Sequence, residues 1–203
     1  MLATALFVGG AVAEATTTNT TEVTWSTLDP TSCRFFNDTM SRYIASHPTN
    51  DPRLAQLRAA LPNATDNKCR VKHTVSHQNL HTSPVARLLG VVTASADGCS
   101  GFWDSLDYYW AGQVWVGYTQ VNHGSCWTTD QLVWLTWGPD CNASFYYPYA
   151  FQLQWCGTPL NYANPMQVGG NWFVYAILDP FYGHNAWERV NTYNNGLEYV
   201  YGG

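Results

Sequence analysis

Two acidic residues near the end of the chain could serve as a catalytic pair. Glu188 and Glu198 flank the dipeptide Asn195-Gly196, which is typical of a two-residue hairpin turn because both residues tolerate positive φ. That turn would place Tyr193 opposite Glu198 and leave Glu188 about five residues further along the partner strand, ~17 Å away and on the opposite face. Glycoside hydrolysis needs carboxylates ~5–10 Å apart. This register therefore predicts no catalytic pair.

Three histidines occur at a spacing of four, at His73, His77 and His81. On a helix this spacing would stack three imidazoles on one face, as in zinc sites. The Thr-Val-Ser between the first two histidines forms helices poorly, and an extended chain would separate the outer two by ~26 Å. We expect these histidines to bind no metal, and the sequence predicts no cofactor.

Other catalytic motifs are not found in the sequence. It has no G-x-S-x-G element and no glycine-rich phosphate loop, and Gly169-Gly170 lies inside a strand-like run. Arg189, the only basic residue after position 100, is next to Glu188 and is interpreted as a structural ion-pair partner. The sequence does not decide whether the protein is an enzyme.

The N-terminus and the cysteines indicate an exported protein. Residues 1–15 are apolar and end in Ala13-Glu14-Ala15, which is typical of a signal peptide and its cleavage site. An even number of cysteines without a C-x-x-C pair indicates disulfides. Four sequons add potential glycosylation sites at Asn19, Asn37, Asn63 and Asn142. We expect a secreted, extracellular glycoprotein.

The cysteine positions leave two disulfide patterns open. The six residues are Cys33, Cys69, Cys99, Cys126, Cys141 and Cys156. If residues 131–137 and 145–155 form a hairpin around a turn at 138–142, then Cys126 faces Cys156 and Cys99 pairs with Cys141. The alternative pairs Cys141 with Cys156 and Cys99 with Cys126. Both patterns share a disulfide between Cys33 and Cys69.

The two halves of the chain differ in composition. Residues 100–203 contain 26 of the 31 aromatics and carry a net charge of −6, whereas residues 1–99 carry +1. An acidic half of this kind lacks the basic surface that nucleic acids or anionic membranes attract. No apolar run is long enough to span a bilayer. We expect neither a nucleic-acid partner nor a membrane span.

Periodicity predicts helices in the first half and strands in the second. Helices are expected at 35–44, from a stripe of apolar side chains, and at 51–61, where Asp-Pro provides an N-terminal cap. Strands are expected at 113–121, 131–137, 150–155, 168–178, 187–193 and 197–201. The fold class is mainly β: a signal peptide (1–15), a small helical or irregular N-terminal segment (16–98), and a jelly-roll-like antiparallel β-sandwich (99–203).

The aromatic content suggests a function for the second half. A two-layer module of ~100 residues cannot bury 26 aromatic side chains at ordinary packing density, so some must lie on the surface. Exposed rings beside Asn and Gln suit binding of a glycan or another extracellular surface. The candidates are Tyr146, Tyr147, Tyr149, Tyr162 and Tyr182. The alternatives are a small secreted hydrolase and a purely structural cell-surface protein.

Overall fold

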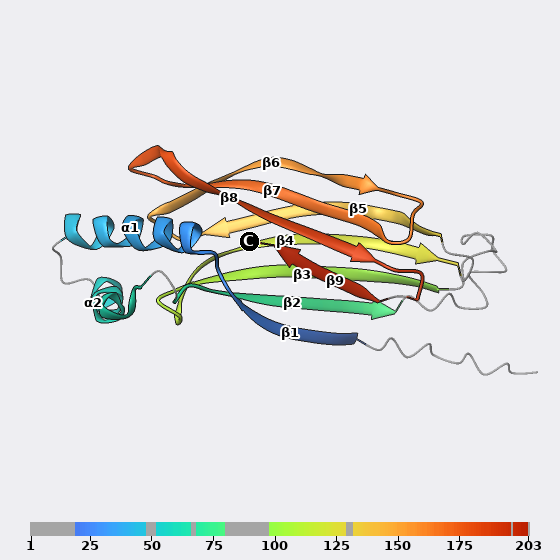
Figure 1. The fold of residues 1–203 in the computed structure, drawn as a ribbon, viewed down its shortest axis with the longest axis horizontal. Coiled ribbons are helices and arrows are strands. Elements are labelled where there is room, and N and C mark those ends of the chain that lie inside the picture. The colour runs from blue at the N-terminus through green and yellow to red at the C-terminus, as the bar shows by residue number, and fades with distance from the viewer. Residues whose placement is uncertain are drawn as a thin grey trace, which may run out of the picture.

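A computed structural model describes residues 19–47, 52–65, 68–79, 98–128, 132–195 and 197–202. The predicted signal peptide and His81 lie outside the described residues. Most of the described chain belongs to two antiparallel sheets, with two α-helices at one end (Figure 1). None of the described helices combines the length and apolarity that crossing a membrane requires.

The two sheets form the β-sandwich that the sequence predicted. The first sheet has the order β1 (Asn19–Thr27), β2 (Arg70–Asn79), β3 (Gly98–Trp110), β4 (Val114–Trp127) and β5 (Val133–Phe145). The second has the order β6 (Tyr149–Leu160), β7 (Met166–Ala176), β8 (Asp179–Thr192) and β9 (Glu198–Gly202). In both sheets, strands that follow one another in the chain are hydrogen-bonded neighbours, so each sheet is a meander without Greek-key crossovers.

Both predicted helices are present, and the first extends beyond its predicted range at both ends. Helix α1 (Pro30–Ser46) begins after Asp29, whose carboxylate accepts hydrogen bonds from the backbone N–H groups of Thr31 and Ser32 at 2.9 and 3.0 Å. This N-cap satisfies donors that the first helical turn cannot pair internally. Helix α2 (Pro52–Ala60) continues into a 3₁₀ turn (Leu61–Asn63).

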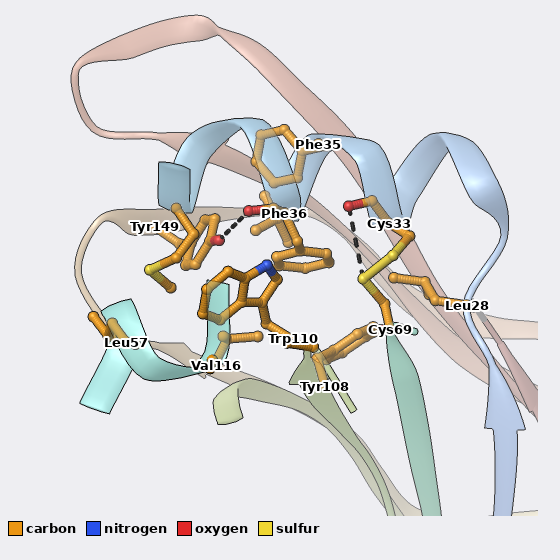
Figure 2. Close-up of a cluster of buried hydrophobic side chains, with 14 of the residues drawn as sticks. Leu28, Cys33, Phe35, Phe36, Leu57, Cys69, Tyr108, Trp110, Val116 and Tyr149 are labelled. Atoms are coloured by element: carbon orange, nitrogen blue, oxygen red, sulfur yellow. Dashed lines mark hydrogen bonds between the residues drawn. A yellow bond between two sulfur atoms is a disulfide. The ribbon is translucent and has the colours of Figure 1, made fainter. Parts of the chain in front are cut away.

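Helix α1 covers one end of the core (Figure 2). Phe36 packs edge-on against Tyr149, with ring centroids 5.1 Å apart, and lies near Tyr108. The hydroxyl of Tyr149 donates to the Phe36 carbonyl at 2.8 Å, so this buried phenol is both packed and hydrogen-bonded. The helix is therefore held by aromatic contacts with both sheets.

The segment before residue 99 contributes two strands that the sequence did not predict. β1 and β2 extend the sheet formed by β3, β4 and β5: β2 pairs with β3, and β1 pairs with β2, each without a break in register. Their residues are mostly Thr, Ser, His and charged, so neither strand carries the apolar alternation that marks a half-buried strand. Both strands are held by backbone pairing, β2 with β3 and β1 with β2.

The disulfides follow the second of the two predicted patterns. Cys33 pairs with Cys69, Cys99 with Cys126, and Cys141 with Cys156. Cys99 and Cys126 lie directly opposite each other on β3 and β4, with Cα atoms 4.0 Å apart. Cys141 and Cys156 link β5 to β6 and thereby join the two sheets.

The expected hairpin around residues 138–142 is wrong. β5 runs through these residues without a turn and pairs with β4, and the chain reverses at 146–148, where it passes to the other sheet. Gly138 and Pro139 are accommodated by an irregular register between β4 and β5 near Asn122 and Gly124. The predicted turn at 138–142 is therefore an irregular stretch of a continuous strand.

Candidate functional site

Many aromatic side chains are exposed, as the composition predicted. The exposed aromatic residues after position 100 are Trp103, Trp137, Tyr146, Tyr147, Phe151, Trp155, Tyr162, Phe181, Trp187, Tyr199 and Tyr201. The core takes up others completely, including Trp110 and Trp172. Aromatic side chains therefore contribute both to the core and to the surface, and the exposed ones can contact other molecules.

Three of the five predicted tyrosines line one hollow at the helical end of the molecule, which we call the tyrosine hollow. It measures about 520 Å³, within the range of small-molecule sites. Its walls are Met40 from α1, Arg53, Gln56 and Leu57 from α2, Gln113, Val114, Trp115 and Val116 around the start of β4, and Tyr146, Tyr147 and Tyr149 where β5 passes to β6.

Two tight turns build the rim of this hollow. The N–H of Tyr149 donates to the carbonyl of Tyr146 at 2.9 Å, and the N–H of Tyr146 donates to the Val116 carbonyl at 2.9 Å. Across the hollow, Ala111 and Gly112 both have positive φ and the N–H of Gln113 donates to the Trp110 carbonyl at 3.2 Å, which defines a type I′ turn. These backbone bonds hold the aromatic and amide side chains in place.

The aromatic side chains of the hollow contact one another at its mouth. Tyr146 packs edge-on against Trp115 with ring centroids 4.9 Å apart, and the Arg53 guanidinium lies 4.5 Å from the centre of the Tyr146 ring. Tyr147 packs edge-on against Tyr43 at 5.0 Å. Tyr146 and Tyr147 remain 49% and 40% exposed, so these rings are supported yet reachable.

Of the five predicted tyrosines, only Tyr146 and Tyr147 are exposed in this hollow. Tyr149 is 2% exposed and forms the floor, so its assignment to an exposed binding surface is wrong. Tyr182 donates to the carboxylate of Asp38 at 2.8 Å and packs against Phe35 in a different part of the helical end. Tyr162, 67% exposed, lies beside the Val133–Ala163 bridge. The five tyrosines were grouped because of their residue type, and the fold places them in different environments.

The sequons lie in different environments. Asn63 and Asn142 are exposed, whereas Asn37 is buried in α1 and its Oδ1 accepts a hydrogen bond from the Trp110 indole at 2.9 Å. The side chain of Asn19 lies outside the described residues. A glycan on Asn37 would have no room in this core, so the structure argues against Asn37 as a glycosylation site.

A second group of polar residues lies between the sheets, and we call it the inner polar cluster. It comprises Asp104 from β3, Thr119 and His123 from β4, Glu188 and Thr192 from β8, and Glu198 from β9. Except for Glu198, whose side chain is 2% exposed, every member has a relative exposure of 0%.

The inner polar cluster overturns the predicted register at Glu188 and Glu198. Glu198 pairs with Thr192, and the N–H of Tyr193 donates to the Leu197 carbonyl, so the connection is one residue longer than a two-residue turn. Glu188 is then four residues from Thr192 on the same strand, and it points inward like Glu198. This shift of one residue places Glu198 on the same inward face as Glu188.

Hydrogen bonds connect part of this cluster. Thr119 donates to Glu188 Oε2 at 3.1 Å, and Thr192 donates to Glu198 Oε1 at 2.8 Å. His123 Nε2 lies 3.1 Å from both the Thr192 hydroxyl and Glu198 Oε1. The cluster thereby joins β4 of the first sheet to β8 and β9 of the second.

Burial shifts the proton affinities of these groups. It raises the pKa of Asp104, Glu188 and Glu198 well above their ordinary values, and neighbouring carboxylates raise the pKa of Asp104 and Glu188 further. Burial lowers the pKa of His123 to about 3, so its imidazole is neutral at physiological pH. Without a counter-charge, these side chains resist ionisation.

The remaining polar candidates have structural partners. His73 and His77 lie on β2, where they bond to the hydroxyls of Ser26 and Thr20. Arg189 points away from Glu188, so the predicted ion pair is wrong. Its guanidinium donates to the Gly170 and Glu188 carbonyls and to Asn171, at 2.9–3.0 Å, and stacks on Trp155.

No family model, no curated protein and no solved structure matches this chain. The fold and the covalent cross-links therefore define its class. Three disulfides in a small, strand-rich chain fit a small extracellular disulfide-bonded protein.

Proposed function

We propose that this protein is a secreted, non-catalytic glycan-binding protein and that the tyrosine hollow holds the sugar. The observation that supports this proposal is the combination of the exposed Tyr146 and Tyr147 rings with Trp115 and with the amides of Gln56 and Gln113. Aromatic faces pack on the apolar C–H face of a pyranose, and amides bond its hydroxyls. Concave sites of this composition are typical of ligand binding.

The charge of the chain favours a neutral glycan. The formal net charge is −5 at pH 7, which disfavours approach of a polyanion. Arg53 is the one ionisable basic side chain among the described residues that line the hollow, and it is stacked on Tyr146. A neutral hexose oligomer is the class of ligand that fits the residues lining the hollow.

The composition of the hollow also supports binding over hydrolysis. The described residues that line it include no Asp or Glu. Glycosidases generally require two carboxyl groups flanking the scissile bond. The three buried carboxyl groups of the inner polar cluster lie in the closed interior and have no access to a sugar.

A binding assay with the full chain tests this proposal. The purified protein is screened on an array of neutral oligosaccharides, and the affinity for the best ligand is measured by calorimetry. Tyr146→Ala should weaken binding about tenfold, because truncating an aromatic anchor costs more than about 1 kcal/mol. Near-ultraviolet circular dichroism checks that the variant is folded.

A matched variant on another face distinguishes this site from general loss of fold. Tyr199, on β9, is 58% exposed on the outer face of the second sheet. Tyr199→Ala removes the same side chain and should leave the affinity unchanged. Equal losses for both variants, or no binding of the unmodified protein to any neutral glycan, would refute the assignment.

A further inference from the structure

The inner polar cluster contains more acceptors than the protein satisfies. Among the described residues, both oxygens of Asp104, Oε2 of Glu198, Oε1 of Glu188 and Nδ1 of His123 are buried without a hydrogen-bond partner. Buried polar atoms are normally paired, and an unpaired buried carboxylate is especially costly. Five such atoms in one cluster point to a missing positively charged or proton-donating group.

The geometry of three of these residues fits one metal ion. Asp104, His123 and Glu198 each offer a ligand atom, and these atoms lie within 4.8 Å of one another. Ligands held at ~2.0–2.2 Å from one ion are about 3.4 Å apart in tetrahedral geometry and up to about 4.4 Å apart across an octahedron. Side-chain movements of about 1 Å or less would complete such a site.

From these contacts we propose that Asp104, His123 and Glu198 bind a divalent metal ion of the Zn²⁺ or Mn²⁺ type inside the sandwich. Two carboxylates with one imidazole form a mixed oxygen–nitrogen ligand set, which suits these ions better than Ca²⁺ or Mg²⁺. The ion would supply the positive charge that no described side chain brings to this cluster. Glu188, held by Thr119, places a further buried carboxyl group in the same cluster.

Hydrogen bonds and ring stacking with neighbouring residues orient the proposed ligands Glu198 and His123. Oε1 of Glu198 accepts from the Thr192 hydroxyl and lies 3.1 Å from His123 Nε2. The His123 ring also stacks on Phe102, with ring centroids 5.0 Å apart. Metal ligands are commonly fixed in this way by hydrogen bonds and packing around them.

The proposed metal site would have a structural role, because its ligands are buried between the two sheets. The ligands come from β3, β4 and β9, and therefore from both sheets. An ion bound there would tie the two sheets together inside the sandwich. Its binding energy would add to folding stability, as in other structural metal sites.

Metal content and stability test this proposal on the full chain. The protein is unfolded in denaturant with EDTA, its disulfides kept intact, dialysed, and refolded with or without ZnCl₂, MnCl₂ or CaCl₂. We expect about one equivalent of Zn²⁺ or Mn²⁺ by elemental analysis. At a concentration about 100-fold above the dissociation constant, the ion should raise the melting temperature by about 5–10 °C.

Two variants identify the ligands. Asp104→Asn should abolish metal uptake and make the melting temperature independent of EDTA and Zn²⁺. Asp140→Asn is the matched control, because Asp140 is exposed on β5 and its replacement removes the same charge; it should bind metal like the unmodified chain. Metal uptake by the Asp104→Asn variant equal to that of the unmodified protein would overturn the assignment of Asp104 as a ligand.

Two further outcomes would also overturn the proposal. If no metal binds and no ion shifts the melting temperature of the unmodified protein, the carboxyl groups share protons instead. If Ca²⁺ alone stabilises the protein, the imidazole of His123 is not a ligand. Neither result would bear on glycan binding, because the tyrosine hollow shares no residue with the inner polar cluster.

Discussion

The indole N–H of Trp110, at the end of β3, donates a 2.9 Å hydrogen bond to Oδ1 of Asn37 in helix α1. Both side chains are buried, and the bond links the helix to the first sheet. The amide of Asn37 thereby completes the only hydrogen bond that the indole can make.

Asn37→Ala should lower the free energy of unfolding by about 1–3 kcal/mol, because it leaves the buried Trp110 N–H without its acceptor. Urea denaturation measures this change. Asn63→Ala, at an exposed sequon, is the control and should stay within about 0.5 kcal/mol of the unmodified protein. An unchanged midpoint for Asn37→Ala would show that water or another group replaces the amide.

His184 should make the protein sensitive to acid. The ring lies against Phe35 and Phe36, and burial lowers its pKa to about 4, although nearby Asp29 acts in the opposite direction. The unfolded value is near 6.5. Because the folded pKa is the lower of the two, the stability from neutral His184 is present above pH 6.5. It is lost as pH falls toward 4, by up to about 1.4 kcal/mol per pH unit.

His184→Phe tests this pH dependence. The variant keeps an aromatic ring and removes the titrating group, so unfolding free energies measured between pH 7 and 4 should fall less steeply than in the unmodified chain. His123 titrates in the same direction and remains in both proteins, so the difference between the two curves isolates His184. Parallel curves would contradict this role.

Removing the Cys33–Cys69 disulfide should cost more stability than removing Cys141–Cys156. The first joins residues 36 positions apart and the second 15. Loop-closure entropy then gives about 4 kcal/mol for the first and about 3 kcal/mol for the second. Paired Cys→Ala variants and urea denaturation measure the order, and peptide mapping under non-reducing conditions checks the three pairs. A mapped Cys126–Cys156 bond would contradict the fold.

The predicted elements that proved accurate depended on local signals. Predicting α2, which begins at Pro52, and α1, with its apolar stripe, required only a few neighbouring residues; the predicted cap Asp51 lies outside the described residues. The strands rich in Trp, Tyr and Val were also predictable, because such residues favour pleated, half-buried backbone. β1 and β2 gave no comparable signal, because their polar residues form strands through tertiary pairing: β2 pairs with the edge of β3, and β1 pairs with β2.

The candidate site was predictable in part. Tyr146 and Tyr147 were recognised as surface aromatics, but their partner Trp115 lies more than 30 positions earlier in the chain and was not. The inner polar cluster was missed because the Asn195-Gly196 connection was counted one residue too short. Asp104, His123 and Glu198 carry no spacing motif. Only the alternation of Asp104 with Phe102 and Leu106 could have indicated that this acid points inward.

The sequence alone determined that this is a disulfide-bonded, strand-rich chain with more aromatic rings than its interior can hold, because composition and local periodicity limit what can be buried. The tertiary structure decided which rings meet in the tyrosine hollow and which carboxylates lie inside. Those outcomes depend on strand register and on which strands become neighbours, and a one-residue shift in register reverses the face of every side chain that follows.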